Sequence, residues 1–251
     1  MRETRYYENF TDDFEETANQ NYVLPDDYRW IKTDFGSRFL SAIIYALAVF
    51  FGFFYCKFGL RLKKIHGRKK LKKFNGKYFL YGNHTQPVGD VFLPAMSAFP
   101  KRIYTVVGTA NYGIPVIGKI LPYLGALPVK ETLSGLKNLG NAISTRISQE
   151  HPVVIYPEAH VWEYYTEIRP FPLTSFKFPT AENTPVFSST VVYQKTKILK
   201  RPKSEIYIDG PFYGEGETTK ERAENLRNKV FEKMTERSKL SNYEYIQYIK
   251  K

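Results

Sequence analysis

A histidine and an aspartate lie six positions apart in the stretch YGNHTQPVGD (81–90), and these two residue types at this spacing suit acid–base chemistry. His84 follows a short aromatic and apolar run, KYFLYGN (77–83), which predicts a buried strand. Glycine and proline then interrupt regular structure, so a turn is expected to bring Asp90 beside one imidazole nitrogen. The other nitrogen would act as a base toward a hydroxyl group, for a rate gain of about 10²–10⁴. The alternative is an ordinary loop histidine followed by an aspartate that caps a helix.

The elements around this loop predict a sheet of strands alternating with helices. Apolar residues at helical spacing predict helices over 133–149 and 218–239, and a short helix broken by proline and glycine is expected over 111–125. Strands are predicted at 102–108, 126–130, 151–159, 184–193 and 204–210, of which 126–130 is expected at an edge of the sheet. This alternation predicts an α/β fold with a mixed or mainly parallel central sheet flanked by helices.

Glu158 occupies the same kind of position as His84. It follows the predicted strand PVVIY in the sequence HPVVIYPEA (151–159). Functional loops of α/β sheets gather at the carboxyl ends of the strands. We therefore expect His84, Asp90 and Glu158 to share one pocket.

Residues 39–56, FLSAIIYALAVFFGFFYC, form an uncharged apolar segment. A helix that spans a bilayer needs about 20 residues, so this segment is a borderline span. Half of a hairpin within one leaflet and a helix that lies in the interface are the alternatives. The segment starts too late for a cleaved signal peptide. We expect it to attach the protein to a membrane.

Charge is distributed unequally around this segment. Residues 1–38 hold nine acidic and five basic residues, whereas residues 57–77 hold ten basic residues and no acid. The positive-inside rule then predicts that the C-terminal side faces the cytoplasm. A run of Lys and Arg also suits nucleic acid, but the adjoining apolar segment favours anionic membrane lipid as the partner and excludes a nucleic-acid function. This run accounts for most of the net charge of +12.

Length and composition limit the remaining options. The 251 residues suffice for one sizeable α/β domain with appendages: an acidic tail (1–38), an apolar anchor with a basic juxtamembrane stretch (39–77) and the α/β domain (78–251). The single cysteine excludes an internal disulfide and a cysteine-rich zinc site. No Gly-x-Ser-x-Gly sequence occurs, which disfavours a serine hydrolase.

Four short blocks occur in an order that resembles the glycerophospholipid acyltransferases of the lysophosphatidate (1-acylglycerol-3-phosphate) type. They are Asn83-His84 with Asp90, then Gly125 to Lys130, then Tyr156-Pro157-Glu158-Ala159, then Thr184-Pro185-Val186. The family has a histidine–aspartate motif, a Gly-to-Arg block, a Phe-Pro-Glu-Gly block and a Val-Pro-Ile block in these places. The match covers roughly residues 75–195, and the apolar segment before it is similar to the family's membrane anchor.

The chain departs from the family pattern at three places. Five residues rather than four separate His84 from Asp90, Lys130 and Glu131 stand where an arginine usually binds phosphate, and Ala159 stands where glycine is usual. Lysine lacks the bidentate fork of arginine, and a glutamate repels phosphate. Because these changes cluster on the acceptor side, we infer that the chemistry is kept while the identity of the acceptor stays open.

The resemblance implies an O-acyltransferase of phospholipid biosynthesis. It would transfer a fatty acyl group from acyl-carrier protein or acyl-coenzyme A to a hydroxyl of a glycerol-phosphate or lysophospholipid-type acceptor at the membrane. His84 is then the general base and Asp90 orients it, without a covalent intermediate, a metal or another cofactor. The implied substrate-binding positions are Glu158, Lys130, Arg169, Pro157 and Gly125, among which Lys130 and Arg169 would bind phosphate.

Two other functions stay open at this point. A membrane-bound transacylase or hydrolase would use the same dyad. An inactive lipid-binding protein would keep the fold without the chemistry. This alternative rests on the departures from the family pattern on the acceptor side.

Overall fold

The computed structural model describes residues 3–15, 19–197 and 199–251. Residues 1–2 and 16–18 of the predicted acidic tail lie outside the described residues. The helices are α1 (Phe35–Phe54), α2 (Arg68–Lys73), α3 (Gly89–Ala98), α4 (Ile117–Leu124), α5 (Leu133–Ser148), α6 (Lys177–Ala181) and α7 (Thr219–Ser238). The strands are β1 (Glu3–Tyr7), β2 (Leu62–His66), β3 (Phe79–Gly82), β4 (Tyr104–Gly108), β5 (Ala126–Val129), β6 (Val153–Ile155), β7 (Val186–Gln194), β8 (Lys203–Phe212) and β9 (Ile246–Lys250).

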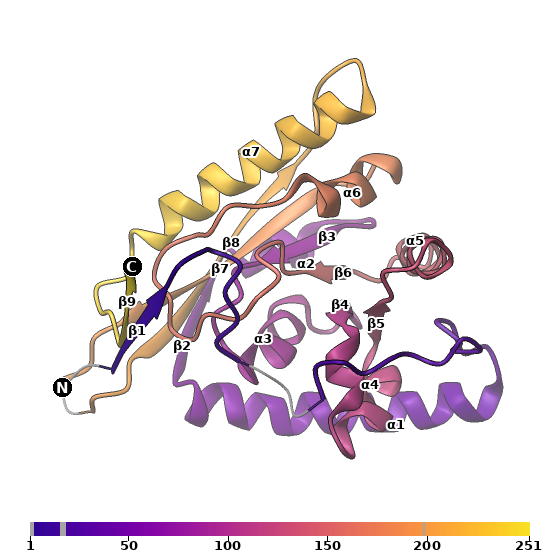
Figure 1. Cartoon of the computed structure of the whole chain (residues 1–251), viewed down its shortest axis with the longest axis horizontal. Coiled ribbons are helices and arrows are strands. Elements are labelled where there is room, and N and C mark those ends of the chain that lie inside the picture. Colours follow the sequence, from indigo (N-terminus) through magenta and orange to yellow (C-terminus); the bar gives the residue numbers. More distant parts are fainter. Residues whose placement is uncertain (1–2, 16–18, 198) are drawn as a thin grey trace.

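Seven strands form the central sheet, in the order β2-β8-β7-β3-β6-β4-β5 (Figure 1). The strands β7, β3, β6, β4 and β5 run parallel, and β8 pairs antiparallel with β7. The predicted α/β fold with a mainly parallel sheet is therefore confirmed, and so is the edge position of β5. The carboxyl ends of β3 and β6 are neighbours, because these two strands pair along Phe79–Tyr81 and Val153–Ile155.

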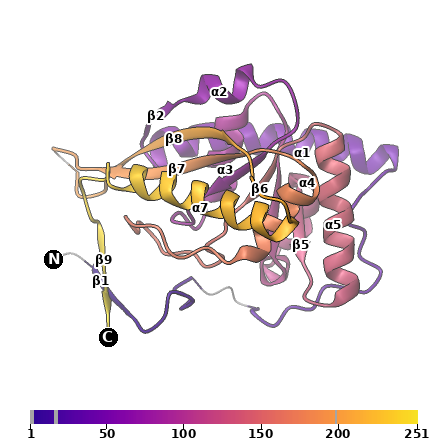
Figure 2. The ribbon, with the colours of Figure 1, turned by 90° about the horizontal axis from the view of Figure 1, so that it is seen from above.

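The two faces of the sheet pack against different helices. Along β3, Phe79 and Tyr81 belong to one core cluster together with apolar side chains of α5 and α7. Leu80 points to the opposite face and belongs to a cluster with side chains of α2 and α3. This alternation follows from the two-residue period of a strand, and it makes the sheet the middle layer. Figure 2 shows α7 in front of the sheet and α1 behind it.

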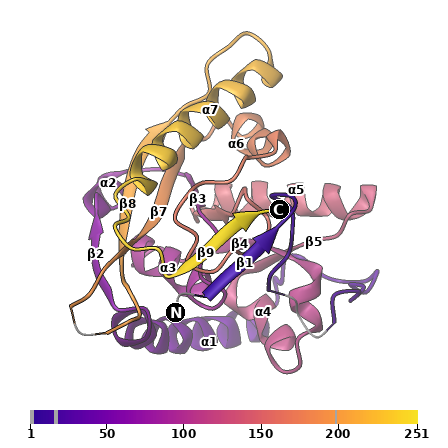
Figure 3. The same ribbon diagram turned by 60° about the vertical axis from the view of Figure 1, so that its left-hand side comes forward.

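Three strands were not predicted. β2 lies within the basic stretch 57–77 and pairs with β8 at the edge of the central sheet, where its exposed Lys63 and Lys64 suit an edge strand. β1 and β9, near the two ends of the chain, pair parallel as a separate two-stranded sheet (Figure 3). Segments from all three predicted parts of the chain thus pack on one another, and the predicted domain boundaries stay a prediction.

Helix α1 has one face against the protein and one face that is exposed. Asp34 caps its start, since Oδ1 accepts a hydrogen bond from the N–H of Ser37 at 2.8 Å. The inner face contacts α4 and α3, and Gly52 permits the close approach of the Phe92 ring. Large apolar side chains are exposed on the outer face at Phe35, Phe39, Leu40, Ile43, Leu47, Phe50, Phe51, Phe53 and Phe54. Among the described residues, Phe35–Gly59 is long and apolar enough to cross a membrane by length and composition.

The segments on both sides of α1 nevertheless pack into the same folded body. Before the helix, Trp30 donates from Nε1 to the carbonyl of Pro128 at 3.2 Å. After it, Ser204 donates to the carbonyl of Leu60 at 2.8 Å and β2 enters the sheet. A helix of 20 residues is about 30 Å long and would separate its flanks across a bilayer. In this arrangement α1 lies along the body of the protein (Figure 1). The positive-inside rule therefore does not assign the two flanking segments of α1 to opposite sides of a membrane.

This arrangement predicts that both flanks of α1 are accessible from the same side of a membrane. Single cysteines at Asn21 and Lys239, in a Cys56→Ala background, should react with an impermeant maleimide in only one of two preparations, right-side-out or inverted sealed vesicles. A cysteine at Phe53 should be protected from the reagent in both, because we expect the exposed apolar face of α1 to lie in lipid. Labelling of Asn21→Cys and Lys239→Cys from opposite sides would show that α1 crosses the bilayer.

Candidate active site

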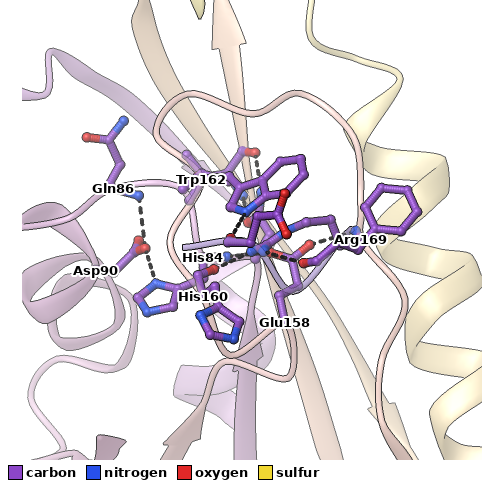
Figure 4. Close-up of polar contacts among 12 residues, drawn as sticks. His84, Gln86, Asp90, Glu158, His160, Trp162 and Arg169 are labelled. Carbon is purple, nitrogen blue, oxygen red and sulfur yellow. Dashed lines mark hydrogen bonds and ion pairs between the residues drawn. The ribbon is translucent and has the colours of Figure 1, made fainter. Parts of the chain in front are cut away.

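His84 and Asp90 are in contact at the carboxyl end of β3 (Figure 4). Nδ1 of His84 lies 2.7 Å from Oδ2 of Asp90, and the same oxygen accepts from the N–H of Gln86 at 3.0 Å. Asp90 is buried in the first turn of α3, where the helix N-terminus stabilises a carboxylate. An ionised carboxylate only accepts hydrogen bonds, so Nδ1 carries the proton and Nε2 is left as the base. The His84 side chain is 20% exposed, which leaves it open to a substrate.

The loop between the two residues is fastened to β7 by Tyr193. The Tyr193 hydroxyl lies 2.7 Å from Oγ1 of Thr85 and accepts from Nε2 of Gln86 at 2.9 Å. Burial raises the pKa of Tyr193 well above its ordinary value, so its hydroxyl stays protonated and donates to the Thr85 carbonyl at 3.2 Å. The additional residue relative to the family pattern is accommodated here without separating His84 from Asp90.

Tyr156 holds the dyad from the neighbouring strand β6. Its ring stacks on the imidazole of His84, with centroids 4.4 Å apart, and its hydroxyl donates to the backbone carbonyl of Asp90 at 2.7 Å. Burial, and then the charge of Asp90, raise the pKa of Tyr156 well above its ordinary value, which keeps this donor protonated. A side chain at Gly82 would meet the Tyr156 ring at 2.7 Å, so glycine is what lets the ring reach His84. The contact of Tyr156 with His84 was not predicted from the sequence. The position of Tyr156 in the block Tyr156-Pro157-Glu158, next to a predicted site residue, was the signal that could have indicated it.

Glu158 and Arg169 form a buried ion pair beneath the His84 backbone. Oε2 of Glu158 accepts from the N–H of His84 at 2.9 Å and from Nη2 of Arg169 at 3.2 Å. Oε1 accepts from the N–H of Arg169 at 2.9 Å. The two side chains are 0% and 1% exposed. Glu158 therefore positions His84, and Arg169 neutralises Glu158 rather than presenting its guanidinium at the surface.

The N-terminal segment covers this pair. Arg169 donates to the carbonyl of Phe10 at 3.3 Å, and its guanidinium lies 4.8 Å from the centroid of the buried Trp162 ring. Trp162 donates from Nε1 to the carbonyl of Asp12 at 2.8 Å, and Nδ1 of His160 lies 3.4 Å from Asp13. The segment is kept in place by the pairing of β1 with β9 (Figure 3). Part of the predicted acidic tail is thus a wall of the candidate site.

Among the remaining predicted residues, Lys130 and Gly125 lie away from the dyad, whereas Pro157 stands between Tyr156 and Glu158. Lys130 follows β5, three strands along the sheet from β3, and its Nζ contacts Asp26 at 2.5 Å and the Leu24 carbonyl at 3.2 Å. Gly125 lies at the opposite, amino-terminal end of β5, where its φ of 92° ends α4. Pro157 is buried at the turn after β6 and has no polar side-chain atom to offer a substrate. Ala159 has a φ of 64°, a left-handed conformation that glycine adopts more easily.

This arrangement can perform base catalysis. A neutral imidazole with a fixed tautomer and one exposed edge removes a proton from a hydroxyl that approaches Nε2. Over the described ranges, no group of three or more His, Cys, Asp or Glu side chains is placed to hold a metal ion.

No protein-family model and no curated protein matches the sequence. Among solved structures, the chain is similar to the crystal structure of the 1-acyl-sn-glycerophosphate (LPA) acyltransferase PlsC from Thermotoga maritima. The TM-score is 0.53 at 15% sequence identity, and the similarity covers 81% of this chain and 93% of that chain. At this identity the likeness shows a shared fold.

The buried pair predicts strong coupling between Glu158 and Arg169. Glu158→Gln and Arg169→Met should each lower the free energy of unfolding by about 3–5 kcal/mol, because each leaves a buried charge unpaired. The double variant should lose less than the sum, since no unpaired charge remains. Urea unfolding of the full chain in detergent measures all three.

Glu236→Gln, which removes the exposed carboxylate that pairs with Lys233, is the matched control and should leave the unfolding midpoint unchanged. The assignment of a coupled structural pair would be contradicted if Glu158→Gln and Arg169→Met lowered the free energy of unfolding only as little as Glu236→Gln does, and if the two losses were additive.

Proposed function

We propose that the protein is a membrane-surface O-acyltransferase that moves a fatty acyl group from a thioester to a lipid hydroxyl. The observation that carries the proposal is the contact of 2.7 Å between Nδ1 of His84 and Oδ2 of Asp90, on a loop that packs against the end of the apolar helix. Leu60, just beyond that helix, lies so close to Gly89 that a side chain at Gly89 would meet it at 2.6 Å. The fold shared with an LPA acyltransferase and the order of the four sequence blocks support the same reaction.

The reaction needs one base and no covalent enzyme intermediate. Nε2 of His84 takes the proton from the acceptor hydroxyl while the oxygen attacks the carbonyl carbon of the thioester. The tetrahedral intermediate expels the thiolate, which takes the proton back from the imidazolium, so an ester and a thiol leave. Asp90 stabilises the imidazolium through Nδ1, while Tyr156 and Glu158 keep the ring and its backbone in place. The donor is acyl-carrier protein or acyl-coenzyme A, and no metal or other cofactor takes part.

The membrane would bring the acceptor to this dyad. Exposed apolar side chains of α1 suit a helix that lies in the interface with its outer face among lipid chains. Val88 and Val91, which lie on either side of Gly89-Asp90, are 53% and 44% exposed and give the loop of the dyad exposed apolar side chains of its own. The basic stretch 57–77 favours the leaflet that is rich in anionic lipid, which is the cytoplasmic one. We therefore propose that the protein acts on the cytoplasmic membrane surface.

The acceptor's charged group is bound by residues other than those the family pattern suggests. Arg169 is buried against Glu158, and Lys130 is paired with Asp26. The basic residues nearest in sequence to Leu60 are Arg61, Lys57 and Lys63, and Leu60 is in contact range of the catalytic loop. Lys63 is paired with Glu205. We propose that Lys57 and Arg61 bind the phosphate of a glycerol-phosphate or lysophospholipid-type acceptor.

Acyl transfer should depend on the dyad. Purified full-length protein receives a labelled acyl thioester and a panel of lysolipid and glycerol-phosphate acceptors in vesicles. His84→Ala and Asp90→Asn should lower the rate of transfer by about 10²–10⁴ without a change in vesicle binding, because the base or its orientation is lost. His66→Gln, at the β2 edge against Glu205, is the matched histidine control and should keep the wild-type rate.

Two outcomes would contradict the proposed acyl transfer. Release of free fatty acid in the absence of any acceptor, lost in His84→Ala, would indicate a hydrolase that uses the same dyad. Neither transfer nor release by folded, vesicle-bound protein would indicate a lipid-binding protein without catalysis.

A further inference from the structure

A cavity lies at the edge of the sheet opposite to the dyad. His84 and Glu158 follow the carboxyl ends of β3 and β6, whereas this cavity is bounded by residues that precede β4, β5 and β6. Its volume is about 570 Å³, which is in the range of small-molecule sites. The segment Tyr28–Thr33 and the first turns of α1 form its other walls. It belongs to no part of the catalytic arrangement.

The lining of this cavity is strongly basic. It includes Arg29, Lys32, Arg38, Arg102, Arg146 and His151, and no Asp or Glu is among the lining residues. Within the described part of the chain, none of these side chains is within ion-pair distance of a carboxylate. The nearby Asp34 instead caps α1 through Ser37. Like charges that are brought together repel one another, so such a cluster is stabilised by a bound anion.

Two arginines in the cavity keep unused donors. Arg102 donates from Nη2 to Oγ of Ser41 at 2.6 Å and to the Tyr123 carbonyl at 2.8 Å, and Arg146 donates from Nη1 to Gln149 at 3.0 Å. Nε of each arginine is buried and has no hydrogen-bond partner among the described residues. Most buried polar atoms are paired, so two unpaired guanidinium donors beside one cavity point to a ligand.

The two guanidinium groups are held near each other by an aromatic ring. The centroid of Tyr104 lies 5.3 Å from Cζ of Arg102 and 4.3 Å from Cζ of Arg146. Burial, and then the charges of Arg146 and Arg102, lower the pKa of His151 below its ordinary value. The positive potential is therefore present in the ligand-free protein, and the donors that produce it are pre-organised.

We propose that this cavity is an anion site that binds a phosphate group. Planar guanidinium forks match the oxygens of phosphate, and two of them with further cations suit a doubly charged group. The wall formed by Ser37, Arg38 and Ser41 belongs to the helix whose outer face is exposed and apolar. A phospholipid headgroup and a free phosphate ion have the same binding chemistry, and the experiment separates them.

The test compares the full chain with Arg102→Gln/Arg146→Gln and with the control Lys220→Gln/Arg227→Gln, which removes two charges from α7. Thermal unfolding is followed in inorganic phosphate and in chloride at equal ionic strength. Phosphate should raise the Tm of the wild type and the control, and its apparent Kd should be about tenfold weaker or more in the cavity variant. Flotation with phosphatidylcholine vesicles, with and without phosphatidic acid, forms the lipid arm.

A response to inorganic phosphate that the cavity variant loses supports a free phosphate as occupant. A loss of binding only to the phosphatidic acid vesicles supports a lipid headgroup. Equal behaviour of the cavity variant and the control in both arms overturns the proposal. His84→Ala should keep the phosphate response, so failure of the proposed reaction and failure of this site are distinguishable.

A second variant covers the case in which the double variant does not fold. Ser41→Asp places a carboxylate against Arg102, in the position of the hydroxyl that Arg102 already contacts. It should abolish the response to phosphate, because the internal carboxylate replaces the anion. An unchanged phosphate response in Ser41→Asp contradicts the proposal.

Discussion

The buried ion pair between Glu158 and Arg169 is the interaction on which the candidate active site depends. The carboxylate of Glu158 is fully buried, and a buried charge is tolerated only when it is paired and hydrogen-bonded. Arg169 supplies the opposite charge, and the backbone N–H groups of Arg169 and His84 supply the remaining donors. The same carboxylate therefore joins the ends of β3 and β6 and the loop that follows them. The place of His84 relative to Asp90 is set by this network, with Tyr156 stacked against the ring.

The N-terminal segment gives the buried pair its low exposure. Phe10 and the residues around it cover Arg169 and Trp162, and β1 is held by β9 near the other end of the chain. The two cations that the sequence blocks mark for phosphate, Arg169 and Lys130, are both engaged from this side. A fold shared with a solved acyltransferase structure thus coexists with basic side chains that are engaged within the protein. Two departures from the family pattern, Lys130 and Ala159, lie at this edge, whereas His84 and Asp90 keep their contact.

Local sequence patterns predicted what local physics determines. Short apolar runs identified the parallel strands, and the spacing of His84, the turn residues and Asp90 predicted their contact, because a strand, a turn and a helix start leave few arrangements. The pairing of β1 with β9 joins residues from the two ends of the chain, and no local pattern encodes it. The orientation of α1 is also beyond its own sequence, since an apolar helix of this length is compatible with spanning or lying flat. The role of Arg169 depends on burial, which the motif does not contain.

The distribution of paired and unpaired charges separates structural cations from ligand-binding ones. At the edge of the sheet that holds the candidate site, acids of the N-terminal segment lie against basic side chains: Asp26 against Lys130, Asp13 against His160 and Glu15 against Arg5. Acidic residues of the segment 1–38 thus pair with basic residues at this edge. At the opposite edge no carboxylate lines the cavity that holds Arg102 and Arg146. The protein pairs its cations at one edge of the sheet and leaves them without carboxylate partners in a cavity at the other edge, so the positive potential that attracts an anion is located in that cavity. The net charge of +12 is therefore a property of particular sites, the basic stretch 57–77 and this cavity, rather than of the surface as a whole.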